Sequence, residues 1–506
     1  FFNSFLRESK MGKIGFDSEL YRKMQSEKIR ERISLYDKLY LEFGGKLFDD
    51  YHASRVLPGF LPDGKLQMLL TLKEEAELLI VINAADIANN KVRHDLGISY
   101  DQDVLRLIDA FRMVDLYVGS VVITQYAGQP EADTFIKLLK KLGVKVYKHY
   151  NIKGYPSDVE YIVSDQGFGK NDYVETTRKL VIVTAPGPGS GKMATCLSQL
   201  YQENKRGVKA GYAKFETFPI WNIPLKHPVN VAYEAATADL NDVNMIDPFH
   251  LESYGVAAVN YNRDVEVFPV LDAMFKKIHG TSPYKSPTDM GVNMAGFCII
   301  DDDVCRHAAE QEILRRYYHA KCRALQYGTD NTAEIFKIEL LLQQTGIDET
   351  ARPVIAAALK KAKLTDAPAT AIELPDGKII TGKTSSLLGA SSAMLLNALK
   401  YLANIPDEQP IISPHVIEPV QDLKTIYLGN GNPRLHIDEL LVALSICAVT
   451  SDDARLALSQ LPKLRNCEMH SSVILANVDM NVLSRLGIRL TCEPKYQTKK
   501  LYHKKG

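Results

Sequence analysis

Three absences narrow the function of this chain before any motif is considered. No apolar run approaches the ~20 residues that cross a bilayer, and 61 basic residues balance 61 acidic ones. The seven cysteines are scattered without a CxxC pair, which is typical of reduced thiols rather than of a disulfide framework. We therefore expect a cytoplasmic protein that binds neither membranes nor nucleic acids. The sequence leaves the oligomeric state open, a homo-oligomer included.

The sequence also lacks internal repeats and low-complexity tracts. Its 506 residues exceed what one hydrophobic core supports, so about two to four domains are expected. Hydrophobic residues make up 46% of the chain and charged residues 24%, which is ordinary for a globular protein.

Strand and helix patterns alternate through the first half of the chain. The runs Leu78–Asn83 and Val118–Tyr126 are rich in apolar residues, as expected of strands that are covered on both faces. We predict an α/β, multi-domain fold with a mostly parallel sheet that includes a P-loop-like strand-loop-helix. Its predicted parts are an N-terminal α/β (Rossmann-like) domain at 13–175, a P-loop-like α/β region continuous with it at 176–259, a helical segment at 260–362, and a smaller C-terminal α+β domain at 363–506.

Two local patterns give further structural predictions. Pro219, Pro224 and Pro228 indicate a long irregular loop that reaches Pro248. The pair Asp376-Gly377 stands between two apolar runs, which predicts a β-hairpin in the C-terminal domain.

The segment Lys179–Tyr201, KLVIVTAPGPGSGKMATCLSQLY, predicts a buried strand, a turn and a helix. We call residues 185–191 the glycine loop. Glycines let successive N–H groups wrap a phosphate, and the helix that follows adds its positive end. The residues that we expect to bind a phosphorylated cofactor are Gly187, Gly189, Ser190, Gly191, Lys192 and Thr195.

The glycine loop departs from the usual pattern GxxxxGK[ST] at both ends. Pro186 stands at the first glycine position and Met193 at the hydroxyl position, so the usual magnesium ligand is missing. Ser190 or Thr195 are the candidate substitutes. The alternative interpretation is a structural strand-to-helix turn without a ligand.

The same stretch resembles the loop of dethiobiotin synthetase-like P-loop enzymes, VTGTxTxVGKT, through Val183-Thr184 and Gly191-Lys192. The likeness extends to Gly207–Lys214, GVKAGYAK, which resembles the next strand of those enzymes and its lysine. The resemblance therefore implies a catalytic role for Lys214 beside Lys192, and Glu216 is a further candidate for a base or a metal ligand.

Polar groups elsewhere are candidates for substrate binding. Some follow a glycine turn, some end a predicted strand where open α/β sheets bind ligands, and some surround the sole tryptophan. Surface or capping roles are the alternative for each. These candidates are Lys46, His52, Arg55, Gln125, Gln129, Trp221 and Asn222.

Many long strings together carry a resemblance to one family. They include LYLEFGGKLFDDYHASRVLPG, DLGISYDQDVLRLIDAF, GYAKFETFPIWN, HPVNVAYEAATADL, DVNMIDPFHLE and NPRLH. The chain resembles, from about Lys13 to Lys505, the bacterial family called domain of unknown function 1846 or uncharacterised protein family 0371. That resemblance implies a soluble bacterial protein with a larger N-terminal and a smaller C-terminal part. It implies no reaction.

Three hypotheses about function remain. The first is an enzyme that binds a nucleotide or a phosphorylated metabolite at Gly187–Lys192 for phosphoryl transfer or ATP-dependent ligation, with ATP or GTP and Mg²⁺ as candidate ligands. The second is a non-catalytic protein that binds or senses a small phosphorylated molecule. The third is a sugar-phosphate transferase that does not use ATP.

Overall fold

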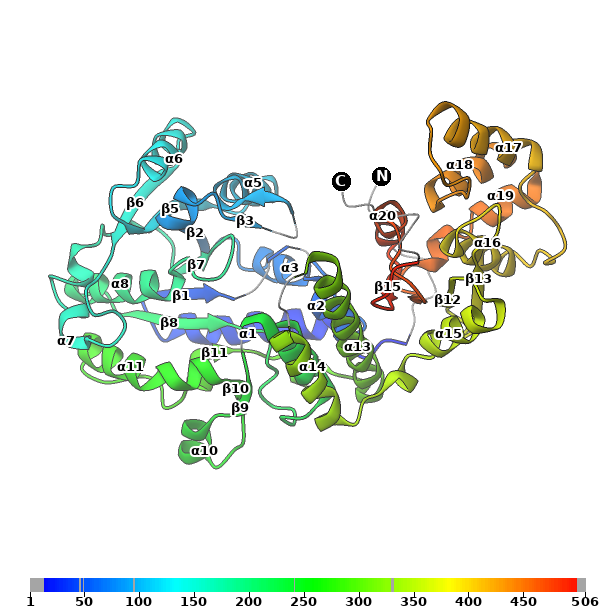
Figure 1. Cartoon of the computed structure of the whole chain (residues 1–506). Helices are drawn as coiled ribbons and strands as arrows, with labels where there is room; N and C mark the ends of the chain where they lie inside the picture. Colours follow the sequence, from blue (N-terminus) through cyan, green and yellow to red (C-terminus); the bar gives the residue numbers. More distant parts are fainter. Residues whose placement is uncertain are drawn as a thin grey trace. The chain divides into compact units, whose positions relative to one another are not determined.

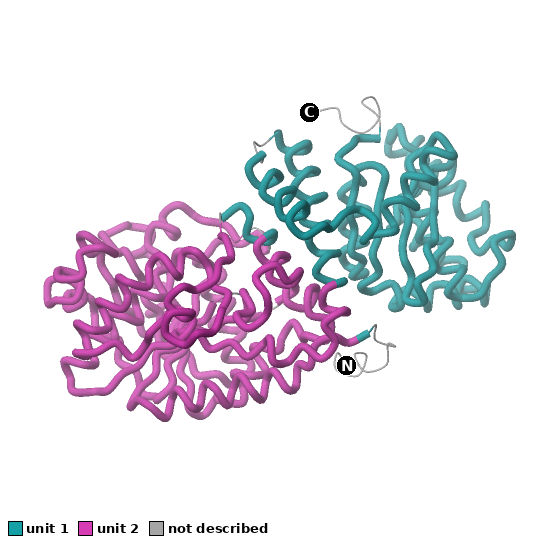
Figure 2. Tube along the Cα trace, turned by 90° about the horizontal axis from the view of Figure 1, so that it is seen from below, with its two compact units in different colours: residues 1–13, 235–240, 307–506 teal, residues 14–234, 241–306 magenta. Residues whose placement is uncertain are grey.

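The chain folds into two compact units, which are described separately (Figure 2). The computed structural model describes residues 13–44, 47–48, 50–93, 96–240, 242–328 and 332–497. Unit 2 comprises residues 14–234 and 241–306, and unit 1 comprises residues 1–13, 235–240 and 307–506.

Unit 2 is built on one sheet of seven strands, and every pair of neighbouring strands is parallel (Figure 1). The strand order is β11-β8-β1-β7-β2-β5-β6. The predicted α/β fold with a mostly parallel sheet is thereby confirmed. The strands are β1 (Lys38–Phe43), β2 (Ala76–Asn83), β5 (Val118–Tyr126), β6 (Lys145–Tyr150), β7 (Leu180–Thr184), β8 (Ala210–Phe215) and β11 (Gly291–Val292).

Helices cover both faces of this sheet, because alternate side chains of each strand point to opposite faces. Leu39 and Leu41 of β1 join a core with the first set of helices, whereas Tyr40 joins a second core with the other set. The first set is α1 (Ser18–Ser34), α3 (Gly64–Leu70), α5 (Tyr100–Met113) and α6 (Pro130–Lys141). The second set is α8 (Lys192–Lys205) and α11 (Asn262–His279).

Shorter elements complete unit 2. Residues 219–227 contain no helix or strand, as the prolines predict, but the irregular loop does not reach Pro248, because a nine-residue helix starts at Pro228. Proline suits the first turn of a helix, where its missing N–H group is not needed, so Pro228 and Pro248 begin helices instead of breaking them. The shorter elements are α2 (Tyr51–Val56), α4 (Ala84–Ala88), β3 (Val92–Arg93), β4 (Ile98–Ser99), α7 (Val159–Ile162), η1 (Phe168–Lys170), α9 (Pro228–Ala236), β9 (Asn244–Ile246), α10 (Pro248–Tyr254), β10 (Val259–Tyr261), α12 (Pro287–Met290) and η3 (Ala295–Cys298).

Unit 1 contains a smaller mixed sheet of order β13-β12-β14-β15. Asp376-Gly377 lies in the turn between the antiparallel strands β12 and β13, which confirms the predicted hairpin. Ala371 of β12 packs against α15, and its neighbour Ile372 faces a core with α16 and α18. The strands are β12 (Ala369–Glu373), β13 (Ile379–Lys383), β14 (Glu468–Ser471) and β15 (Arg489–Cys492).

Helices make up much of the rest of unit 1. They are α13 (Asp302–Tyr327), whose first residues belong to unit 2, and η2 (Ala238–Leu240), α14 (Thr332–Thr345), η4 (Glu349–Ala351), α15 (Pro353–Thr365), α16 (Ala390–Leu402), α17 (Pro414–Asp422), η5 (Leu423–Tyr427), α18 (Ile437–Cys447), α19 (Asp452–Leu458), η6 (Leu461–Leu464) and α20 (Asn477–Arg485).

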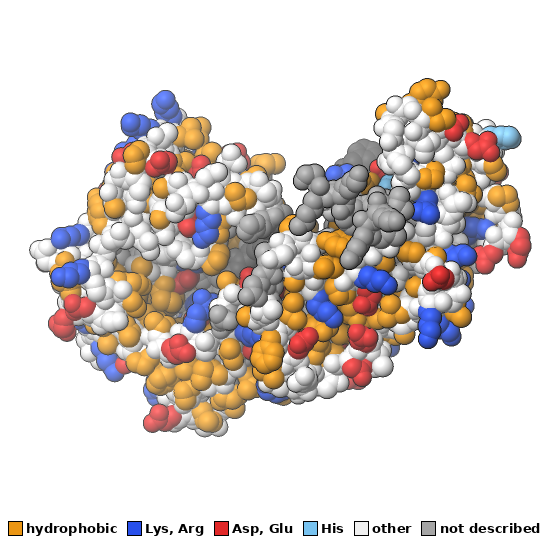
Figure 3. Space-filling model, in the orientation of Figure 1, with side chains coloured by type: hydrophobic (Ala, Val, Ile, Leu, Met, Phe, Trp, Pro, Cys, Tyr) orange, Lys and Arg blue, Asp and Glu red, His pale blue; other side chains and the backbone are white. Residues whose placement is uncertain are grey.

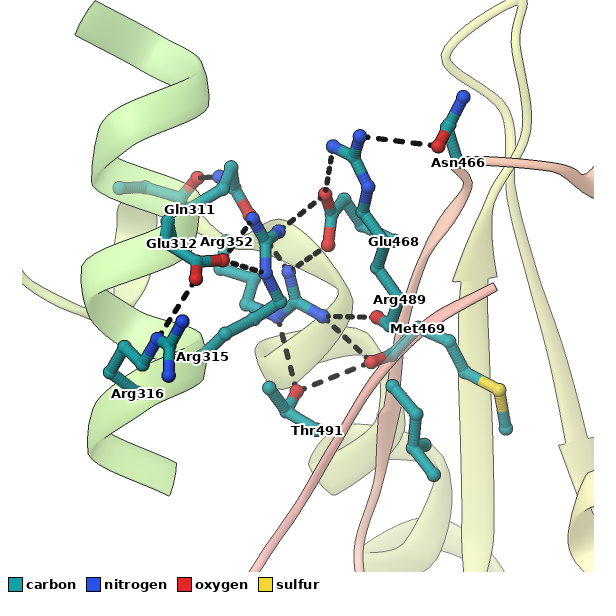
Figure 4. A network of polar contacts seen from close by, with 12 residues as sticks. Gln311, Glu312, Arg315, Arg316, Arg352, Asn466, Glu468, Met469, Arg489 and Thr491 are labelled. Atoms are coloured by element: carbon teal, nitrogen blue, oxygen red, sulfur yellow. Dashed lines mark hydrogen bonds and ion pairs between the residues drawn. The ribbon is translucent and has the colours of Figure 1, made fainter. Parts of the chain in front are cut away.

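A buried polar network joins α13 to the sheet of unit 1 (Figure 4). Arg352 is fully buried, and its guanidinium donates to Thr491, to Gln311, to the carboxylate of Glu468 and to the carbonyl oxygens of Met469 and Arg489. The buried cation therefore has a partner for each of its three nitrogens, as a buried charge requires.

Three general properties concern the charged surface, the cysteines and the helices. Charged side chains of both signs are scattered over the face drawn in Figure 3. All seven cysteines are free thiols. No helix in the described ranges is both long enough and apolar enough to span a bilayer.

Candidate functional site

The glycine loop of unit 2 lies at a point where the connections of the sheet diverge. β1 and β7 are adjacent and parallel. From β1 the chain continues to β2, beyond β7, whereas from β7 it continues to β8, on the other side of β1. Open α/β sheets bind ligands at such a divergence, in the crevice outside the carboxyl ends of the strands. The topology therefore puts the glycine loop where a ligand is expected.

The backbone of the glycine loop leaves several amide groups without an acceptor among the described residues. Gly189 has φ +76° and Gly191 has φ +88°, values that residues with a Cβ rarely adopt. In the part of the chain that the structure describes, no acceptor binds the N–H groups of residues 189–194. Consecutive N–H groups at the start of a 14-residue helix form a strong anion-binding feature.

Neighbouring strands and helices hold the glycine loop in this conformation. The Thr124 hydroxyl, at the end of β5, donates to the Ser190 carbonyl oxygen at 2.7 Å. The Ser190 hydroxyl donates to the Gly187 carbonyl oxygen at 2.8 Å. A Cβ on Gly187 would lie 2.2 Å from the Tyr100 hydroxyl oxygen, so only glycine fits against this ring.

The first turns of α8 contain three residues that bear on ligand binding: Lys192, Met193 and Thr195. The Lys192 ammonium forms no ion pair with a described residue. Met193 packs against the core between the sheet and α8, where its side chain offers no magnesium ligand. Thr195 is fully buried, and its hydroxyl has no hydrogen-bond partner among the described residues. The loop therefore offers donors and one cation to a ligand.

A buried cluster of charges lies beside the glycine loop, at the carboxyl ends of β1 and β8. The Lys214 ammonium pairs with Glu216 at 2.8 Å and also with Asp264 of α11. Glu42 lies beside Lys214 in the register of the two strands and accepts a hydrogen bond from the Tyr212 hydroxyl at 2.8 Å. These five side chains are the carboxyl-edge cluster.

The electrostatics of the carboxyl-edge cluster favour the protonated, charged form of Lys214. Burial alone lowers the pKa of Lys214, but the charges of Asp264, Glu216 and Glu42 outweigh it and raise the pKa above its ordinary value. Burial also raises the pKa of Glu216, and the charge of Asp264 adds to this against the opposing charge of Lys214. Lys214 is therefore a firmly held cation whose charge two carboxylates already balance.

The Cys196 thiol is influenced by charges from both the carboxyl-edge cluster and the end of the glycine loop. Burial raises the pKa of this thiol most, the charge of Glu42 raises it further, and the charge of Lys192 lowers it. Both charged groups therefore act on one buried thiol of α8.

The other predicted binding residues fall in three places. Gln125 accepts a hydrogen bond from the Asn83 amide at 3.1 Å and directly follows Thr124. Gln129 bonds to its own turn, through the Ala127 N–H and the Gln125 carbonyl oxygen. Gln125 therefore lies next to the glycine loop, whereas Gln129 serves its own turn.

The remaining candidates follow β1 and β8. The His52 ring packs edge-on against Phe218 and Tyr233, each with ring centroids 5.3 Å apart. Arg55 lies in the last turn of α2, and Lys46 is outside the described residues. Both His52 and Arg55 thus lie on the short helix that follows β1.

The sole tryptophan is held by backbone contacts. The Trp221 indole N–H donates to the Asn293 carbonyl oxygen at 2.8 Å. The Asn222 side-chain oxygen is buried without a partner among the described residues and lies close to Gly296. These contacts are typical of residues that fix a loop conformation.

Sequence reasoning did not single out four residues of this region: Glu42, Tyr100, Thr124 and Asp264. Only Glu42 carried a local signal, because it is the one acidic residue in the otherwise apolar strand Leu39–Phe43. The other three reach the loop or the carboxyl-edge cluster from elements that are adjacent only in space.

Comparison with known proteins places the chain in a family. Residues 14–346 match "Domain of unknown function DUF1846, N-terminal", and residues 350–502 match "Domain of unknown function DUF1846, C-terminal". The chain is 56% identical to UPF0371 proteins of Streptococcus pyogenes serotype M5 and of Streptococcus sanguinis, over 98% of this chain and 100% of each relative. The chain therefore belongs to the DUF1846 family, also named UPF0371.

Proposed function

We propose that unit 2 binds the phosphate group of a small phosphorylated molecule at the glycine loop. One observation carries this proposal: the N–H groups of residues 189–194 have no acceptor among the described residues, and they lie at the divergence between β1 and β7. A buried or half-buried run of unpaired amide donors is costly unless a ligand or water accepts from it. A phosphate supplies the acceptors and the negative charge that the end of α8 favours.

Lys192 and the carboxyl-edge cluster have different roles in this proposal. Lys192 forms no ion pair with a described residue, so it contributes a positive charge to the bound phosphate. Lys214 is neutralised by Glu216 and Asp264, so it positions these carboxylates beside the ligand. Gln125, next to Thr124, is the candidate for a contact with the rest of the ligand.

Binding at the glycine loop does not require Mg²⁺ in this proposal. Met193 occupies the position of the usual metal-binding hydroxyl and packs against the core. The Ser190 hydroxyl is already used within the loop. This favours a phosphorylated metabolite or a regulatory ligand bound directly by amide groups.

A second candidate function is phosphoryl transfer or ATP-dependent ligation. The observation that favours it is the group of carboxylates beside the loop, since Glu42 accepts from Tyr212 and lies next to Lys214. Carboxylates in such a position serve as general bases or bind the metal of a nucleotide complex. Magnesium dependence distinguishes this candidate from the first.

Calorimetric titration of the purified protein with ATP, GTP and sugar phosphates, with and without Mg²⁺, tests the proposal. We expect at least one of them to bind, and the variant Lys192→Ala to weaken that binding at least tenfold. The matched control is Lys205→Ala, which removes an exposed lysine from the other end of α8 and leaves binding unchanged. Equal affinities of the wild type and Lys192→Ala would refute the site, and binding that needs Mg²⁺ would favour the second candidate.

A further inference from the structure

Unit 1 contains a pocket of about 420 Å³ that is separate from the glycine loop. Its walls come from the end of α13, the first residues of α16, the segment before α18, the first residues of α20 and the segment after β15. This volume falls within the range of small-molecule sites, roughly 300–1,000 Å³. The pocket lining includes Tyr327, Ser391, Asn432, Arg434, His436, Asn477, Asp479 and Tyr496.

Two basic side chains line this pocket with donors to spare. The Arg434 Nε donates to the Ser385 carbonyl oxygen at 2.7 Å, which orients the guanidinium. The His436 Nδ1 contacts Asp479 at 3.3 Å. No described residue accepts from the two terminal nitrogens of Arg434 or pairs with the Nε2 of His436.

Asp479, the one acidic side chain among the described residues that line the pocket, has protein partners for both carboxylate oxygens. One carboxylate oxygen accepts from the Ile437 N–H at 2.9 Å. The other accepts from the Ser391 hydroxyl at 3.0 Å and contacts His436. The hydrogen bond to Asp479 raises the pKa of His436 against the opposing effect of burial. The carboxylate therefore stabilises a cationic imidazole and holds the ends of α16, α18 and α20 together.

Two of these helix ends leave their N–H groups open. Neither α16, with 13 residues, nor α20, with nine, has a side-chain cap. Among the described residues, no acceptor binds the N–H groups of residues 390–392 or 477–479. By contrast, α18 is capped by Glu439 and Asp479.

Asn432 gives an independent indication of a ligand. This residue is only 7% exposed and lines the pocket. Its amide oxygen accepts from the Arg434 N–H at 3.2 Å, whereas no described residue accepts from its amide nitrogen. An unpaired donor at a pocket wall is expected to have a ligand or water as its partner.

We propose that this pocket is a second binding site, for the phosphate monoester of a small polar metabolite. The donors are too many for a carboxylate, which offers about four lone-pair positions, because Arg434, His436, Asn432 and two helix ends all supply them. A phosphate has more acceptor positions and the charge that helix ends and guanidinium groups prefer. Tyr327 and Tyr496 supply aromatic surface for the rest of the molecule.

The test uses inorganic phosphate as the probe, and phosphorus NMR line broadening as the readout. The full chain carries Lys192→Ala throughout, so that binding at the glycine loop is weakened and the change at Arg434 is measured against the same background. We expect phosphate to bind this protein, and the further change Arg434→Gln to weaken binding at least tenfold. The control is Arg455→Gln, an exposed arginine of unit 1 that pairs only with the nearby Asp452 and Ala448, and it leaves binding unchanged.

Each result decides the proposal. Absence of phosphate binding to the Lys192→Ala protein would overturn it, as would equal binding by Arg434→Gln. Acetate that competes as strongly as phosphate would overturn the assignment to phosphate. If Arg434→Gln does not fold, His436→Asn replaces it, since asparagine removes the imidazole and is itself favoured at the residue that precedes a helix. The site does not depend on the proposed function of unit 2, because Arg434→Gln changes unit 1 alone.

Discussion

Gly191 has a left-handed backbone conformation and no room for a side chain. Its φ is +88°, and a Cβ there would lie 3.0 Å from the Thr124 hydroxyl oxygen. Gly207 lies just beyond the opposite end of α8, with φ +75° and open space where a Cβ would be. Both residues therefore have a left-handed backbone conformation that favours glycine, but only Gly191 belongs to the proposed site.

We expect Gly191→Ala and Gly207→Ala each to lower the free energy of unfolding by about 1–2 kcal/mol, the cost of left-handed backbone with a side chain. Gly191→Ala is also expected to weaken phosphate binding, because the added methyl group shifts the amide groups of the loop. Urea denaturation and calorimetric titration of both variants check this. A loss of binding in Gly207→Ala of the same size would attribute the effect to stability alone.

Lys214 is the cation that pairs with both Glu216 and Asp264. We expect Lys214→Met to destabilise unit 2 by about 3–5 kcal/mol, because Glu216 and Asp264 lose their partner in a buried setting. The double variant Lys214→Met/Asp264→Asn should recover part of this loss, since one of the uncompensated charges is removed. Urea denaturation measures both, and a double variant less stable than the single one would contradict the assignment.

The strand β14 is joined to α13 and α15 through Glu468 (Figure 4). Its carboxylate pairs with Arg315 at 2.6 Å, with Arg489 at 3.4 Å and with the buried Arg352. Burial alone raises the pKa of Glu468, but the three arginines outweigh it and lower the pKa from 4.5 to about 2.

This pKa shift predicts how the stability of unit 1 depends on pH. A group whose pKa is lower in the folded state stabilises the fold fully above its unfolded pKa, and the contribution is lost as the pH falls through the folded value. We therefore expect unit 1 to lose stability between about pH 4.5 and pH 2. Glu468→Gln should remove most of this dependence and cost about 3–5 kcal/mol at neutral pH. Circular dichroism during acid titration is the measurement, and an unchanged acid transition in Glu468→Gln would contradict it.

The two units have separate cores. The cores on the two faces of the large sheet belong to unit 2, and the core around Ile372 belongs to unit 1. We expect two transitions in scanning calorimetry, since a domain with its own core unfolds as its own cooperative unit. Glu468→Gln should lower only one transition and Gly191→Ala only the other. A single transition that both variants shift equally would show that the units unfold together.

Much of the architecture could be predicted from the sequence because its causes are local. Buried strands such as Ala76–Asn83 need continuous apolar residues, and a left-handed turn needs glycine at positions such as Gly191. The hairpin at Asp376-Gly377 followed in the same way from two adjacent residues. The prediction from Pro228 was wrong for a local reason as well, since proline both ends and begins helices.

Strand order and helix packing fix the remaining features, which no local pattern contains. Glu42 meets Tyr212, 170 residues later in the chain, only because β8 is added beside β1 and not beside β7. Likewise, Asp479 meets Ile437 and Ser391 only because the ends of three helices converge in unit 1. Hydrophobic periodicity states which face of an element is buried, but it does not state which other element buries it. Buried charges and pockets depend on that second choice, so they emerge only when distant segments pack together.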